Sequence, residues 1–248
     1  MGDSSGSFLP ASFKPAPELT DGQIHIWTIS KRPLTSSDYI AFLSKEEFTR
    51  ASGMRSPQLF DRFVADHGAL RLLLSAYLDM DPRKLPIAAN SYGKPALNLP
   101  LCRLSFNMSH SGELTLIALC LDSAIGVDVE IIRPIAEWEE IASSHFSQHE
   151  RESLQAEEPA ERLNAFFRCW TRKEALIKAI GMGLSIPLDS FTVNTSLKEP
   201  PALLHCAWAP EAEAIQRWTL IHLEPAAGHV GALAIEDADW SVQQFQWP

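Results

Sequence analysis

The sequence contains no apolar run approaching the roughly 20 residues that a membrane-spanning helix needs. Its longest apolar pieces are short, such as "LTLIALCL" at 114–121. The N-terminus has neither a basic start nor a continuous apolar stretch, which argues against a secretory signal. Residues 1–22 are instead rich in Ser, Gly and Pro, a composition that predicts a disordered tail. We therefore expect no association with a membrane.

Cysteine and positive charge are also scarce. The cysteines Cys102, Cys120, Cys169 and Cys206 lie far apart without CxxC spacing, which argues against a zinc site or a disulfide framework. Cys120 and Cys169 fall inside apolar segments and are predicted to be core residues. A reducing, cytoplasmic setting fits this pattern. With 21 basic and 31 acidic residues the net charge is −10, which opposes general binding to nucleic acid or to an anionic membrane.

The chain does have a composition typical of a folded protein, with 46% apolar residues among 248. Period-two patterns predict strands at "GQIHIWTIS", "RLSFNMSHSGELTLIALCL", "IGVDVEII", "DSFTVNT" and "RWTLIHLEPAAGHVGALAIE". Longer amphipathic patterns predict helices over 35–51, 56–78, 137–155 and 159–184.

The order of these elements repeats along the chain. The sequence therefore predicts an α+β fold made of two similar halves, residues 23–122 and 123–248, related by a pseudo-twofold axis. A ligand would lie at the interface between the halves. Because both halves belong to one chain, we expect a monomer.

The strand "IGVDVE" carries two acids on one face. Asp128 and Glu130 are two residues apart, so both carboxylates point to the same side, roughly 6 to 7 Å from each other. An antiparallel strand with one face in water would explain them without any function. A shared cation is the functional alternative.

A third acid occurs in the strongest predicted helix. On a helical wheel Glu174 lies within the apolar arc, near Trp170, where a carboxylate is costly unless it is paired or binds a metal. Lys178 follows one turn later, so an ordinary intrahelical salt bridge is one explanation. Together with Asp128 and Glu130, Glu174 would otherwise form the oxygen-rich site that a hard cation such as magnesium prefers.

Two turns add groups that suit an anion. Ser109, His110 and Ser111 in "NMSHSG" offer hydroxyl and imidazole groups in a tight bend, although such a bend is also an ordinary hairpin turn. Lys94 in "YGKP" is either a solvated loop lysine or a phosphate ligand.

Four of these segments occur together in a known family. The ordered set "SYGKPAL", "FNMSHSG", "GVDVE" and "CWTRKEALIKAIGMGLSIPLDSF" resembles the 4′-phosphopantetheinyl transferases of the surfactin-synthetase-activating type, over about residues 24 to 236. The resemblance implies magnesium-dependent transfer of 4′-phosphopantetheine from coenzyme A to a serine of an apo acyl or peptidyl carrier protein, with release of 3′,5′-ADP. Such carriers serve fatty acid, polyketide and nonribosomal peptide assembly.

The resemblance also implies roles for individual residues. The metal ligands would be Asp128, Glu130 and Glu174, with Glu174 or a water that it orients as the base and Lys178 at the departing phosphate. Glu150 in "FSQHE" matches a family acid near the metal. The implied coenzyme A contacts are Arg50, Arg55, Arg71, Lys94, Ser109, His110, Asp128 and Lys178.

The carrier protein is expected to dock on the second half. Apolar residues there and the segment "SSHFSQHE" are the candidate surface. Arg168 and Arg172 lie away from the apolar arc of their helix, and we hypothesise that they contact an acidic carrier. Competing interpretations are a non-catalytic module that binds coenzyme A or a carrier, and a phosphohydrolase that uses the same carboxylates. A structural protein leaves Glu174 unexplained.

Overall fold

The computed structural model describes residues 16–30 and 35–247, so most of the predicted tail, residues 1–15, lies outside the described residues. The first half comprises β1 (Gln23–Ile29), α1 (Ser36–Ile40), α2 (Lys45–Ser52), α3 (Pro57–Leu78), β2 (Ile87–Ala89), β3 (Pro95–Leu97), β4 (Leu104–Ser111) and β5 (Leu114–Leu121). The second comprises β6 (Ile125–Ile131), α4 (Trp138–His145), α5 (Gln148–Ala156), α6 (Arg162–Ile180), β7 (Phe191–Val193), β8 (Leu203–Cys206), α7 (Glu211–Arg217), β9 (Trp218–Leu223), β10 (His229–Glu236) and β11 (Ser241–Gln246).

The two halves share one strand topology, which confirms the predicted α+β class. In the first sheet β5 lies between β1 and β4, and in the second β10 lies between β6 and β9. Every one of these pairings is antiparallel. In each half, therefore, the third of the three long strands along the chain, β5 or β10, lies between the first two, as expected for related units.

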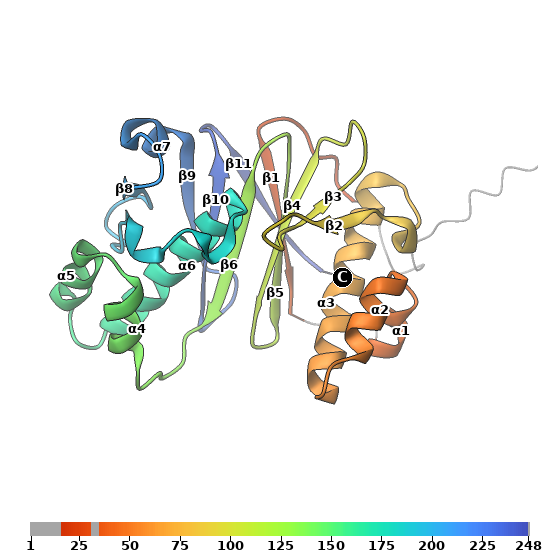
Figure 1. The fold of residues 1–248 in the computed structure, drawn as a ribbon, viewed down its shortest axis with the longest axis horizontal. Helices are drawn as coiled ribbons and strands as arrows, with labels where there is room; N and C mark the ends of the chain where they lie inside the picture. Colours follow the sequence, from red (N-terminus) through yellow and green to blue (C-terminus); the bar gives the residue numbers. More distant parts are fainter. Residues whose placement is uncertain (1–15, 31–34, 248) are drawn as a thin grey trace, which may run out of the picture.

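The main elements stack in four layers, with α3, the first sheet, the second sheet and α6 following one another across the molecule (Figure 1). The sequence of β5 is almost entirely apolar because both faces of the strand are buried. Leu116 and Ala118 face the second sheet, whereas Ile117 and Leu119 face α3. A strand buried on both faces has no need of polar alternation. Cys120 and Cys169 are fully buried, as predicted.

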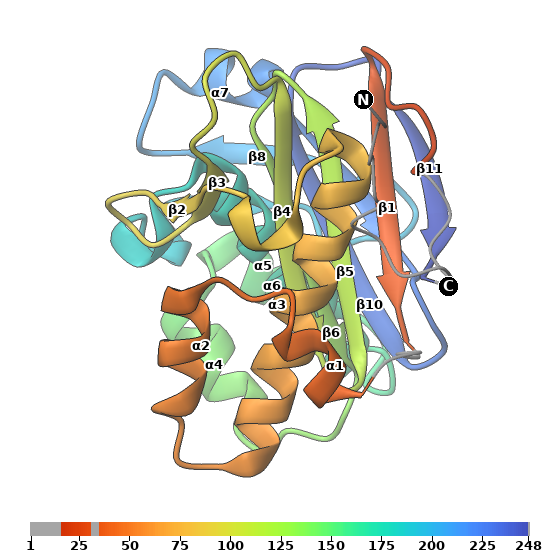
Figure 2. The same ribbon diagram turned by 90° about the vertical axis from the view of Figure 1, so that its right-hand side faces the viewer.

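The last strand crosses from one half to the other. β11 pairs in parallel with β1, from Gln23 with Ser241 to Thr28 with Gln246, and the two strands lie side by side in Figure 2. The side chain of Trp247 is buried in the core beneath the first sheet. The predicted boundary, which gives all of 123–248 to the second half, is therefore wrong for this strand, because its partner lies in the first sheet.

Two predicted helices are each broken in two. The segment 35–51 divides into α1 and α2 at Ser44, and the segment 137–155 divides into α4 and α5 at Ser147. Both serines cap the following helix in a capping box, with Glu47 and Glu150 as the reciprocal partners. Serine competes for backbone hydrogen bonds and so begins a new helix where apolar periodicity alone suggested continuity. Among the described residues, no helix is long and apolar enough to cross a membrane.

Candidate active site

The site forms where α6 lies directly on β6. At Gly126 an added Cβ would stand 2.1 Å from the carbonyl oxygen of Ala175 and 2.3 Å from the amide nitrogen of Ala179. Only glycine permits this approach of a helix backbone to a strand. Since Asp128 and Glu130 are on the same side of β6 as Gly126, the contact places both acids beside α6.

Asp128 is the buried centre of the site, with its side chain 6% exposed. Its Oδ1 accepts hydrogen bonds from Ser109 Oγ at 2.8 Å and from Lys178 Nζ at 2.6 Å. Its Oδ2 is buried without a hydrogen-bond partner among the described residues. A buried carboxylate oxygen without a donor is costly, and a bound cation would satisfy it.

Glu130 and Glu174 complete a group of three acids. Glu130 Oε2 accepts a hydrogen bond from Ser111 Oγ at 2.7 Å, and Glu174 has no hydrogen-bond partner among the described residues. Burial raises the pKa of Glu130 and of Glu174, and the negative charge of Asp128 raises the pKa of both further. The three carboxylates therefore repel one another across a shared space, which favours a cation between them.

The donor set fits magnesium in kind, being three carboxylates. In the described part of the chain no group of three or more His, Cys, Asp or Glu side chains already lies in ligand positions. The three acids therefore lie near one another, but their carboxylate oxygens do not surround a common point. Binding of a cation would have to draw Glu174 and Glu130 toward Asp128 Oδ2.

Lys178 and Lys94 both point into the interface, with different partners. Lys178 Nζ binds Asp128 and also contacts Ser109 Oγ at 3.0 Å. Lys94 Nζ donates to the carbonyl oxygens of Ile125 at 2.9 Å and Ala179 at 3.0 Å. Burial lowers the pKa of Lys94 to about 8. Lys94 thus joins the β2–β3 hairpin to the second half, and its ammonium is already engaged by the protein.

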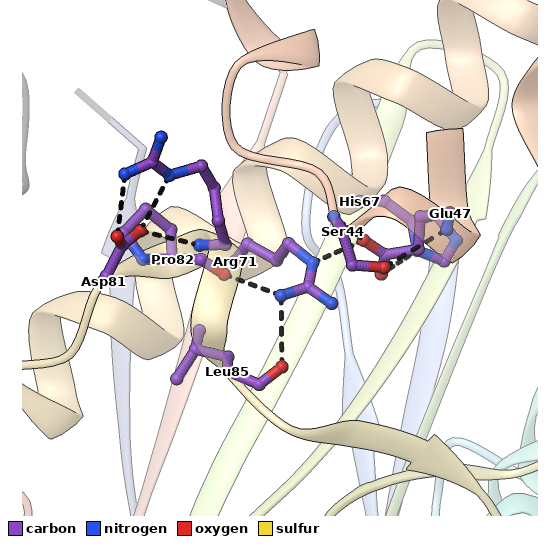
Figure 3. Close-up of polar contacts among 8 residues, drawn as sticks. Ser44, Glu47, His67, Arg71, Asp81, Pro82 and Leu85 are labelled. Atoms are coloured by element: carbon purple, nitrogen blue, oxygen red, sulfur yellow. Dashed lines mark hydrogen bonds and ion pairs between the residues drawn. The ribbon is translucent and has the colours of Figure 1, made fainter. Parts of the chain in front are cut away.

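Arg71 is held inside the first half, contrary to the expected contact with coenzyme A. Its guanidinium contacts Glu47 and donates to the carbonyl oxygens of Pro82 at 2.6 Å and Leu85 at 3.2 Å (Figure 3). Its side chain is 2% exposed, and the pKa of Glu47 falls to about 2 in spite of its burial, because His67 and Arg71 donate to it. Arg71 therefore ties α3 to α2 and to the segment after α3.

Arg50, Arg55 and His110 remain accessible. Arg50 lies at the end of α2 with its guanidinium 5.2 Å from the ring centre of Phe63, and Arg55 is exposed just before α3. His110 is 52% exposed, and its Nδ1 stands 4.0 Å from a carboxylate oxygen of Asp66. These two arginines and His110 are accessible to solvent on the first half, whereas Ser109 is buried against Asp128.

Glu150 belongs to the core and not to the acid group. Its carboxylate pairs with Lys173 Nζ at 2.8 Å, both side chains are 0% exposed, and it accepts the amide of Val193 at 2.7 Å. The resemblance implied that Glu150 is an acid near the metal with a catalytic role, but in this structure its carboxylate is enclosed away from Asp128, Glu130 and Glu174. Its oxygens are used to cap α5 and to neutralise a buried lysine.

Arg168 and Arg172 are also buried, at 6% and 0% exposure. Arg168 Nε donates to the Thr195 carbonyl at 3.0 Å, and Arg172 Nη1 donates to the Asn194 carbonyl at 2.5 Å. Neither can meet an acidic carrier, so that hypothesis is wrong. The helical wheel predicted that both arginines lie away from the apolar arc of their helix. In the structure the loop after β7 covers that side of α6.

Asn107 and Asp66 are two further polar residues near the site, and neither was among the candidates predicted from the sequence. Asn107 Oδ1 accepts the amide of Val127 at 2.9 Å, and Asp66 accepts hydrogen bonds from Arg62 at 3.1 Å and Thr115 at 2.7 Å. Polar residues at alternate positions of β4 were the available signal for Asn107. Asp66 lies on a helix distant in sequence from His110, and no sequence pattern indicates their proximity.

A small apolar cavity of about 140 Å³ opens beside the acids. It is lined by Glu130, Arg133, Ile135, Ile141, Phe166, Phe167 and Trp170. Larger cavities of about 510 and 400 Å³ lie elsewhere and include none of the three acids. The small cavity is therefore the one that continues the site, along the side of α6 that carries Glu174.

Comparison with known proteins agrees with this geometry. The model of the 4′-phosphopantetheinyl transferase superfamily matches residues 124–234, which include β6 and α6. The chain is 32% identical over 226 residues to the 4′-phosphopantetheinyl transferase HetI of Nostoc sp., covering 90% of this chain and 91% of that protein. It is 34% identical over 168 residues to the 4′-phosphopantetheinyl transferase Sfp of Bacillus subtilis, covering 66% and 72%.

One similar solved structure is the ACPS–CoA complex of Chronobacterium ammoniagenes, with 20% identity, a TM-score of 0.36 and coverage of 46% of this chain and 96% of that one. That TM-score is low, and the assignment rests on the sequence relatives. The chain therefore belongs to the 4′-phosphopantetheinyl transferase superfamily, whose enzymes transfer the phosphopantetheine group of coenzyme A to a carrier protein.

Proposed function

We propose that this chain converts an apo acyl or peptidyl carrier protein to its holo form, in a magnesium-dependent reaction. The serine hydroxyl of the carrier attacks the β-phosphorus of coenzyme A. A new phosphorus–oxygen bond forms, the pyrophosphate bridge breaks, and 3′,5′-ADP leaves. The observation that supports this most directly is the meeting of Asp128, Glu130, Glu174 and Lys178 where α6 packs on β6.

Asp128, Glu130 and Glu174 would hold the magnesium ion. The unpartnered Oδ2 of Asp128 and the mutual repulsion of the three carboxylates support this assignment. When bound, magnesium supplies positive charge that stabilises the pyrophosphate oxygens as negative charge develops on them. The protein's own contribution is to keep the three acids close in a partly buried space before substrate arrives.

Glu174 is the proposed base. Its carboxylate has no hydrogen-bond partner among the described residues, so an oxygen is available to receive the proton from the serine hydroxyl, directly or through a water. Its pKa is raised by burial and by Asp128, which makes it a stronger proton acceptor than an exposed glutamate. Lys178 Nζ lies against Asp128, from where it would stabilise the departing phosphate.

The nucleotide part of coenzyme A would bind to the first half. Arg50 and Arg55 are exposed cations that would meet a 3′-phosphate, and His110 is exposed near the end of β4, next along the strand to Ser109 and Ser111. Ser109 would act indirectly, through its hydrogen bond to Asp128. Lys94 would shape the binding face by fixing the hairpin, and Arg71 has no part in it, since its guanidinium is enclosed.

The carrier protein would dock on the second half. The aromatic cavity beside Glu130 supports this, because an apolar side chain close to the acceptor serine would fit there while the serine approaches Glu174. The two halves of one chain supply every residue of the proposed site, which favours a monomer as the active unit.

The test is the intact mass of an apo carrier incubated with the enzyme and coenzyme A, with magnesium or with a chelator. We expect a gain of one phosphopantetheine with magnesium only, and no gain with Glu174→Gln. Release of free phosphopantetheine without a modified carrier would instead identify a hydrolase. Equal modification in the presence of the chelator would refute the metal site.

A further inference from the structure

The strand β4 runs along β6 without forming a backbone ladder with it. The two strands belong to different sheets, and within the described ranges β6 is an edge strand whose one ladder is with β10. Side chains of β4 take the place of a neighbouring strand. Asn107 Oδ1 accepts the amide of Val127 at 2.9 Å, and Ser111 Oγ accepts the amide of Ile131 at 3.0 Å. Two backbone amides of β6 that have no neighbouring strand to bond to are satisfied in this way.

The same row of side chains reaches the carboxylates. Ser109 Oγ donates to Asp128 Oδ1 at 2.8 Å, and Ser111 Oγ donates to Glu130 Oε2 at 2.7 Å. Positions 107, 109 and 111 share one side of β4 because strand side chains alternate. One polar row of the first half thus holds both the backbone and the acids of β6.

We propose that this row, Asn107, Ser109 and Ser111, sets the position of the metal-binding carboxylates, and that Ser111 is the positioning residue for Glu130. The inference rests on the proposed function of the acids. It redirects the sequence expectation, in which the hydroxyl of Ser111 served a bound anion.

The hydrogen bonds of Ser111 explain how its hydroxyl orients the carboxylate of Glu130. The oxygen accepts the Ile131 amide, so its lone pair is oriented by the backbone, and its only proton is directed to Glu130 Oε2. Glu130 is thereby turned so that Oε1 is the oxygen left for a cation. Hydrogen bonds of this kind to a metal-binding carboxylate contribute to metal affinity without touching the metal.

The chain offers a matched set of variants. Ser111→Ala removes the hydroxyl, and Ser111→Thr keeps it on a residue that suits a strand. Ser105→Ala is the control, because Ser105 is two residues from Asn107 on the same strand and its hydroxyl has no hydrogen-bond partner among the described residues. Thermal unfolding of each variant verifies that it folds.

The measurement is the dissociation constant for Mn²⁺, followed by electron paramagnetic resonance in the presence of coenzyme A, together with the Mg²⁺ dependence of carrier modification. We expect Ser111→Ala to weaken metal binding about tenfold, the lower end for such outer-shell residues. Ser111→Thr should restore affinity to within about threefold, and Ser105→Ala should match the wild type.

The outcomes separate this inference from the proposed function. If the wild type binds metal and modifies a carrier while Ser111→Ala shows the wild-type dissociation constant, the positioning role is refuted and the transferase stands. The same holds if Ser111→Thr is as weak as Ser111→Ala. If the wild type shows no metal-dependent transfer, the proposed function itself has failed.

Discussion

The helix α6 carries charged residues on two sides, and the two sides differ in how those charges are paired. On one side Lys173 is enclosed with Glu150, and Arg172 donates to the main chain. On the other side Glu174 has no hydrogen-bond partner among the described residues, and it faces Asp128, whose Oδ2 has none either. Burial of charge therefore does not by itself indicate function. What distinguishes the side of the proposed site is that the carboxylate of Glu174 and Oδ2 of Asp128 lack a hydrogen-bond partner among the described residues.

The largest effect is expected from Glu174→Gln. It removes both the proposed base and a metal ligand, so carrier modification should fall by at least about 10³-fold. The midpoint of thermal unfolding of the metal-free protein should rise, because one of three repelling charges is gone. Intact-mass kinetics and thermal unfolding measure the two effects. An unchanged rate would refute the role of Glu174.

About 100° around α6 from Glu174, Lys173→Met should act on stability. It leaves Glu150 charged and buried, which costs about 3–5 kcal/mol of the free energy of unfolding. The double variant Lys173→Met with Glu150→Leu should recover most of the loss, as replacement of both partners does for other buried pairs. Urea unfolding gives these values. If Lys173→Met lost activity without losing stability, the contrast between the two sides would be wrong.

The arginines of the first half allow a similar comparison, between the exposed Arg50 and Arg55 and the enclosed Arg71. Arg50→Ala and Arg55→Ala should raise the KM for coenzyme A, by about tenfold for whichever meets the 3′-phosphate, because a charge-assisted contact is worth roughly 1.5 kcal/mol. The unfolding free energy should not change for Arg55→Ala, and should fall by no more than about 1 kcal/mol for Arg50→Ala, which loses the contact with the Phe63 ring. Arg71→Ala should lower stability, since the carbonyl groups of Pro82 and Leu85 lose this donor and Glu47 loses one of its donors. Steady-state kinetics at saturating carrier, combined with urea unfolding, separates these outcomes.

The smallest effect is the pH dependence of the metal-free protein. The pKa values of Glu130 and Glu174 are raised in the folded state, so the native protein binds more protons than the unfolded chain. Stability is therefore greatest below the unfolded pKa and decreases as pH rises through the folded values. Asp128 strengthens this effect and Lys178 opposes it. Thermal unfolding between pH 4 and 8 should show the decrease, and magnesium with coenzyme A should abolish it.

Much of the fold could be predicted from local patterns. The long helices α3 and α6 and the strands β4, β5, β6, β9 and β10 fall within the predicted segments, because their apolar periodicity is strong. Short elements such as α7, β8 and β11 were not predicted. Their few residues carry little periodicity, and the pairing of β11 with β1 joins the two ends of the chain.

By itself the sequence determined which groups could do chemistry. Strand alternation places Asp128 and Glu130 on one side, and helical spacing places Lys178 one turn after Glu174. Only the tertiary structure decided which charges are free. Arg71, Glu150 and Arg172 look as reactive in the sequence as Glu174, but packing encloses them with partners from distant segments. Such partners are separated along the chain by many residues, and no local pattern encodes them.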